Sequence, residues 1–64
     1  MIKIFKLMND KRETPIALLE DTERVYFPWV VAFNFNYQSK EWTQGYYFET
    51  EQEALNYFVK KVTN

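Results

Sequence analysis

Few side chains in this 64-residue sequence could act as a nucleophile or a general base. The chain contains no histidine and no cysteine, and Ser39 is its only serine. Histidine is the side chain that normally changes charge near neutral pH, and a hydroxyl nucleophile needs a neighbouring base to activate it. The composition therefore predicts a protein that is not an enzyme, with no catalytic residue and no cofactor.

Two groups of carboxylates remain as candidates for acid–base chemistry or metal binding. They are Glu20, Asp21 and Glu23 in one group and Glu49, Glu51 and Glu53 in the other. The first group lacks the spacing of a calcium loop, so we interpret it as a solvated turn. The second surrounds an expected helix start, where the helix dipole favours acidic residues. Neither group predicts a metal site.

The last residues have the pattern of an amphipathic helix. Thr50 and Glu53 form a Thr-x-x-Glu capping box, and Lys60 and Lys61 lie near the expected C-terminus. Apolar residues recur at helical spacing, namely Ala54, Leu55, Phe58, Val59 and Val62. A helix this short is marginal alone, so its apolar stripe must pack against the rest of the chain.

The preceding residues predict a β-hairpin. From Trp29 to Tyr37 the residues alternate with period two, and the alternation resumes from Trp42 to Phe48. Placing Tyr37 opposite Trp42 would pair Phe35 with Gln44, Phe33 with Tyr46 and Val31 with Phe48, with a four-residue loop over residues 38–41. One aromatic face of this hairpin would then pack on the Leu55, Phe58 and Val59 stripe.

The first part of the chain predicts further strands. In residues 2–8 the apolar phase slips between Ile4 and Phe5, which indicates a bulge or burial on both sides. Residues 16–19 predict a second strand, or alternatively a helical turn. Residues 25–27 either extend the sheet or cross over it.

Pro28 cannot donate a hydrogen bond within a sheet, so it should lie at a strand start or on an edge. Together these segments predict an α+β fold: a single domain over residues 1–64 with a three- or four-stranded antiparallel sheet and one C-terminal helix on one face, in the order β-β-β-β-α.

The second face of the predicted hairpin is the candidate binding surface. It carries small and uncharged residues: Val30, Ala32, Asn34, Asn36, Thr43 and Tyr47. One helix covers only one side of a sheet, so this face is expected to be open unless the N-terminal segment folds over it. It is either an ordinary solvated face or a surface for a protein partner or a second copy. The leading hypothesis is a small accessory or inhibitory domain that binds a protein through this face or an edge strand. In one form of this hypothesis the domain is a homodimer.

Part of the chain also resembles a known family. Phe33-Asn-Phe-Asn-Tyr37, Gly45-Tyr-Tyr-Phe48 and the Thr50-Glu-Gln-Glu-Ala54 junction are similar to the arm-type DNA-binding domain of tyrosine recombinases. The resemblance covers residues 33–58 and implies a three-stranded sheet backed by a helix. In that family Arg and Lys on the open face reach DNA, whereas the equivalent positions here are Asn34, Asn36, Thr43 and Tyr47. The resemblance therefore supports the fold more than DNA binding.

Charge and hydropathy restrict the remaining classes. The net charge of −1 disfavours a general nucleic-acid binder, although Lys3, Lys6, Lys11 and Arg12 gather at the N-terminal end and keep that alternative open. No apolar run reaches membrane-spanning length and no signal-peptide core follows Met1, so a cytoplasmic protein without membrane contact is expected. Amino acids with A/T-rich codons are abundant, which suggests a bacterial or phage origin.

Overall fold

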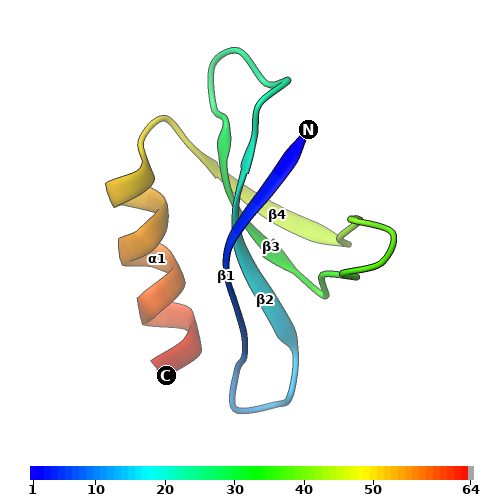
Figure 1. Ribbon diagram of the computed structural model, residues 1–64. Coiled ribbons are helices and arrows are strands. Elements are labelled where there is room, and N and C mark those ends of the chain that lie inside the picture. The colour runs from blue at the N-terminus through cyan, green and yellow to red at the C-terminus, as the bar shows by residue number, and fades with distance from the viewer. Residues whose placement is uncertain (64) are drawn as a thin grey trace.

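The computed structural model describes residues 1–63, which form four strands and one helix. The elements are β1 (Ile2–Asn9), β2 (Pro15–Asp21), β3 (Trp29–Phe33), β4 (Gln44–Phe48) and α1 (Glu51–Thr63). Each strand pairs antiparallel with the next, in the order β1-β2-β3-β4, and α1 lies on one face of the sheet (Figure 1). The predicted α+β architecture is confirmed, with four strands.

The bulge expected in the first strand is present. The register between β1 and β2 shifts between Ile4 and Lys6, so Phe5 is the extra residue. Ile4 is opposite Leu19 on one side of the shift and Lys6 is opposite Leu18 on the other. The Phe5 ring lies against the Trp29 indole, with 5.2 Å between ring centroids.

The helix begins at the predicted capping box. The Thr50 amide donates to the Glu53 carboxylate at 3.3 Å, and the Glu53 amide donates to Thr50 Oγ1 at 3.3 Å. These two bonds satisfy donors that the first turn of a helix leaves without partners. Lys60 and Lys61 lie in the last turn, where their charge complements the dipole.

The core between sheet and helix follows the prediction in part, because Phe35 and Trp42 of the expected aromatic face lie in a second cluster and Tyr37 is 59% exposed. Its buried members come from three elements: Ile16, Leu18, Val31, Ala54 and Phe58. Trp29 and Phe33 pack against them from the sheet, and Leu55 and Val62 from the helix. The prediction that Val59 belongs to this core is wrong, because 47% of Val59 is exposed. The helix turns its Ala54–Phe58 line toward the sheet, which leaves Val59 on the flank.

The predicted hairpin register and strand length are wrong. β3 ends at Phe33 instead of Tyr37, and Val31 is opposite Tyr46 instead of Phe48. The alternation stops at Asn34, whose φ of 57° lies in the left-handed region that asparagine tolerates better than most residues. The loop lies at residues 37–40, since Asn36 and Glu41 form the last bridge.

Beyond Asn34 the hairpin bends onto the sheet face opposite the helix. Residues 34–43 lie on that side of the sheet in Figure 1. Phe35 is therefore buried in a second apolar cluster, with Trp42 packed against it, rather than on the helix face where strict alternation would place it. The other buried members of this second cluster are Ala17, Leu19, Val30 and Ala32.

Candidate functional site

The structure contradicts the expectation of an open second face. Val30 and Ala32 have no exposed surface. Phe35 and Trp42 cover them from the hairpin, and Ile2 and Ile4 pack on the same cluster from β1. Neither Val30 nor Ala32 is therefore accessible to a partner. The sequence did not reveal this because the bend depends on one left-handed residue, Asn34.

Asn34, Asn36 and Thr43 hold the bent end of the hairpin together. The Asn34 amide nitrogen donates to Thr43 Oγ1 at 2.9 Å. Asn36 Oδ1 accepts from the backbone amides of Gln38 and Ser39, at 2.9 and 3.1 Å. All three candidate residues are exposed, but the Asn34 side-chain nitrogen, Asn36 Oδ1 and Thr43 Oγ1 each form a hydrogen bond within the hairpin. Their placement explains the conformation of the turn.

Tyr47, the last candidate of that face, is 38% exposed and lies beside the bent hairpin. Its hydroxyl accepts a hydrogen bond from Trp42 Nε1 at 3.2 Å, and the Arg24 guanidinium lies 4.1 Å from its ring centroid. Gly45 makes room for this contact, because a Cβ there would lie 2.8 Å from Trp42 Nε1 and 2.9 Å from the Tyr47 hydroxyl oxygen. Tyr47 therefore stays accessible at the margin of a closed face.

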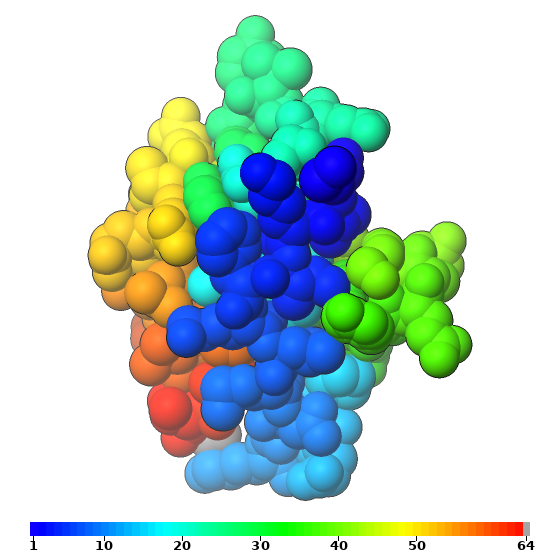
Figure 2. All heavy atoms as spheres, viewed as in Figure 1, coloured from blue at the N-terminus to red at the C-terminus, as the bar shows by residue number. Residues whose placement is uncertain are grey.

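The open backbone of this domain lies along its two edge strands. β1 pairs only with β2, and β4 pairs only with β3. An edge strand presents unpaired amide and carbonyl groups to which another extended chain can add. β1 crosses the front of the molecule in Figure 2, and no other segment covers it there.

Apolar side chains are exposed along the second half of β1. Phe5 is 49% exposed, Leu7 44% and Met8 52%. Leu7 is opposite Ala17 and Met8 is opposite Ile16, so the two side chains lie on opposite faces of the sheet. Sequence reasoning missed this surface. Two features could have indicated it: the shift in the apolar pattern at Phe5 and the presence of two lysines within the strand.

Positive charge accompanies this apolar edge. Lys3 and Lys6 are exposed on β1, and Lys11 and Arg12 are exposed in the turn that follows it. Within residues 1–63 the one ion pair joins the Met1 amino group to Glu23, at 3.2 Å. These four basic side chains are therefore available to a partner's carboxylates or phosphates.

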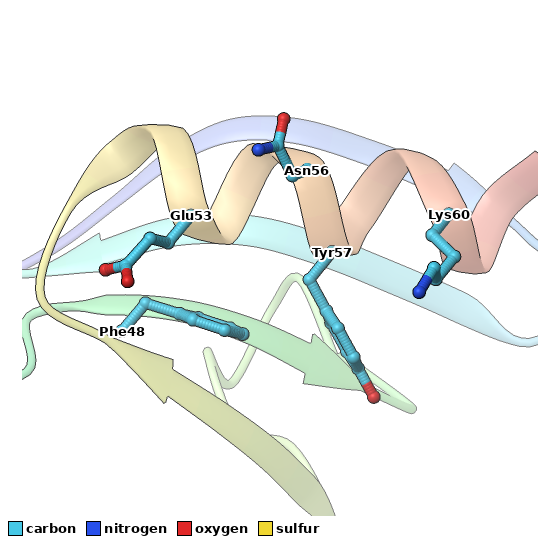
Figure 3. Close-up of a pocket in the computed structure, with 5 residues that line it drawn as sticks. All are labelled: Phe48, Glu53, Asn56, Tyr57 and Lys60. Carbon is cyan, nitrogen blue, oxygen red and sulfur yellow. The ribbon is translucent and has the colours of Figure 1, made fainter.

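The β4 edge has a different character. β4 contains no charged residue, and Tyr46 is 37% exposed. Beside it lies an open groove of about 380 Å³ between β4 and α1, lined by Phe48, Glu53, Asn56, Tyr57 and Lys60. In Figure 3 Glu53 and Lys60 lie toward the two ends of this groove, with Phe48 and Tyr57 between them.

The aromatic floor of this groove is a packed set of rings. The Tyr57 ring centroid lies 5.0 Å from that of Tyr46 and 5.5 Å from that of Phe48. Burial raises the pKa of the Tyr57 phenol above its usual 10.0, and the neighbouring Tyr46 hydroxyl adds to the rise. The groove therefore presents neutral rings flanked by one carboxylate and one ammonium group.

No cluster of three or more potential metal ligands occurs among residues 1–63. Residues 1–63 also contain no helix that is long and apolar enough to cross a membrane. Comparison of the chain with protein-family models, with curated proteins and with solved structures gave no significant match. The fold and its edges define a small α+β domain with two strands open to addition.

Proposed function

We propose that this is a non-enzymatic protein-binding domain that adds an extended segment of a partner protein to the β1 edge. The observation that carries the proposal is the exposure of Phe5, Leu7 and Met8 along an edge strand that pairs on one side only. In strand addition, backbone hydrogen bonds supply affinity and alternate side chains supply specificity. An accessory or inhibitory role in the cytoplasm of a bacterium or its phage agrees with the composition.

The charge of β1 selects the kind of partner. Lys3 and Lys6 lie on the strand, and Lys11 and Arg12 lie just beyond it. A segment that alternates apolar residues with Asp or Glu would cover the exposed side chains and place carboxylates near these bases. Such charge complementarity raises association rates and excludes wrong partners.

Selection from a displayed library of random peptides tests this proposal. We expect enriched peptides to alternate apolar and acidic residues, and to bind the chain with micromolar affinity that weakens as salt rises. Lys6→Glu should lose these peptides, whereas Lys60→Glu, the same charge change on α1, should retain them. Enrichment of basic peptides, or equal binding by both variants, would refute the proposal.

Nucleic-acid binding is a second candidate function, favoured by the same four basic residues. It predicts that short DNA or RNA binds to the β1 side with an affinity that falls steeply as salt increases. A fluorescence titration of mixed-sequence oligonucleotides at low salt separates the two candidates. Lys11→Ala and Arg12→Ala should weaken oligonucleotide binding strongly, since phosphates would contact the turn. They should weaken an apolar–acidic peptide less, because its backbone pairing with β1 remains.

A further inference from the structure

The two edges of the sheet differ in how they would meet a copy of themselves. Antiparallel self-pairing of β1 would bring Lys3 and Lys6 of one chain near the same lysines of the other, and edge lysines discourage such contacts. β4 carries no charge from Gln44 to Phe48 and has no proline or positive-φ residue. β4 is therefore the edge that can accept an identical strand.

The pleat restricts the register of such a pair. In an antiparallel pair, directly opposite residues lie on the same face of the sheet, so each residue must face one of the same parity. Pairing centred on the middle of β4 places Tyr46 opposite Tyr46 of the second copy. Gly45 then faces Tyr47, and Gln44 faces Phe48. No like charges meet, and the tyrosine rings lie side by side on the helix face.

The groove beside β4 has charges that complement themselves under the same twofold axis. Glu53 and Lys60 line its two ends, with Asn56 and Tyr57 midway between them on α1 (Figure 3). Tyr57 packs on Tyr46, so an axis through Tyr46 passes near the middle of the groove. The helices of the two copies would then run antiparallel, with each Glu53 facing the Lys60 of the other.

We infer that the chain forms a twofold homodimer by pairing β4 with β4 of a second copy, so that two sheets join into one and the aromatic groove closes. This interface uses a different edge from the one proposed for partner binding. A dimer leaves β1 free, so either proposal can fail without the other. The closed symmetry of a twofold contact uses one surface patch twice.

Single cysteine variants test the register directly, because the described chain has no cysteine to interfere. Directly opposite residues in an antiparallel pair come close enough for a disulfide. We expect Tyr46→Cys to form a covalent dimer of twice 7.9 kDa under mild oxidation. Leu7→Cys, near the middle of β1, keeps both lysines and should remain monomeric on denaturing gels. Absence of crosslinking in Tyr46→Cys, or equal crosslinking in Leu7→Cys, would overturn the inference.

Charge reversal in the groove gives an independent test by light scattering and sedimentation. Lys60→Glu should weaken the dimer by about tenfold or more, because each of two pairs becomes a repulsion. Glu53→Lys should do the same, and an equimolar mixture of the two variants should form heterodimers again. Lys6→Glu should leave dimerisation unchanged. Glu53→Gln, which retains a capping group, separates loss of the pair from loss of the helix cap.

Circular dichroism and thermal melts of each variant exclude unfolding as the cause of a lost dimer. Hydrogen exchange adds a readout that needs no substitution: the amides of β4 should become more protected as protein concentration rises, and those of β1 should not. A wild-type chain that stays monomeric up to about millimolar concentration, or a dimer that persists in Lys60→Glu without heterodimer preference, would overturn the inference.

Discussion

The rings of Phe35 and Trp42 stack across the hairpin at 6.3 Å, on the sheet face opposite α1. This pair covers the second face of the sheet, so that neither face of this small sheet is left fully exposed to solvent. We expect Phe35→Ala to lower the free energy of unfolding by about 3–5 kcal/mol, as for other buried aromatic residues. Urea denaturation followed by fluorescence measures it. Tyr37→Ala is the control, because Tyr37 is 59% exposed and should change stability by less than about 0.5 kcal/mol.

Asn34 determines where β3 stops, since its φ is 57°. Asn34→Gly should retain the bend, whereas Asn34→Val should cost about 1–2 kcal/mol more, because a β-branched residue is strained in the left-handed region. Chemical denaturation of both variants gives the difference. Thr43→Val removes the acceptor of the Asn34 side chain without affecting φ. If it destabilises as much as Asn34→Val, the hydrogen bond rather than the backbone conformation controls the bend.

Thr50 caps α1 through its hydroxyl. Thr50→Ala should cost about 1 kcal/mol, while Thr50→Ser should be nearly neutral because serine keeps the acceptor. Thermal melts followed by circular dichroism compare the two variants. Equal melting temperatures for Thr50→Ala and wild type would show that the capping box does not contribute to stability.

Asp10 organises the β1–β2 turn. Its carboxylate accepts hydrogen bonds from the backbone amides of Thr14 at 2.9 Å and Arg12 at 2.8 Å, and the Thr14 bond is the largest cause that lowers its pKa below 3.8. The contribution of Asp10 to stability is therefore present above pH 3.8 and is lost as the pH falls through the lower pKa of the folded state. The carboxyl shift of Asp10 in an NMR titration should give a pKa below 3.8, and Asp10→Asn should reduce the acid dependence of unfolding.

Tyr57 should give stability a dependence on alkaline pH. Because its folded pKa is raised above 10.0, chiefly by burial, its contribution is present below that value and is lost as the pH rises through the folded pKa. Unfolding measured from about pH 8 to about pH 12 should show a decline that is less steep in Tyr57→Phe. A steeper decline in that variant would contradict a raised pKa for Tyr57.

The sequence predicted features that depend on local chemistry. The Thr50–Glu53 capping box follows from two neighbouring residues and is present. The strand start after Pro28 and the bulge at Phe5 were each one of two predicted alternatives, and the structure has both. The hairpin register depended on where alternation stops. Asn34 can adopt a β or a left-handed conformation, and in the structure the second accompanies contacts outside the strand: the packing of Phe35 over the sheet and the hydrogen bond to Thr43.

The burial of Val30 and Ala32, two of the six candidate site residues, was missed for the same reason. Val30 and Ala32 have the small side chains of an open face, but small residues are also what a returning hairpin requires beneath Phe35 and Trp42. Exposure of Leu7 and Met8 could not be predicted from their apolar character, because it arises from the position of β1 at the edge of the sheet. Strand order, unlike strand identity, is not encoded by a single segment.

The lysines of β1 have a consequence for the limits of assembly. A domain with two open edge strands could add further copies edge to edge and grow into a fibre. In the proposed β4 dimer the two remaining edges are both β1, so further growth would bring Lys3 and Lys6 of one edge against the same lysines of another. We therefore expect that neutralising both lysines would allow such dimers to polymerise.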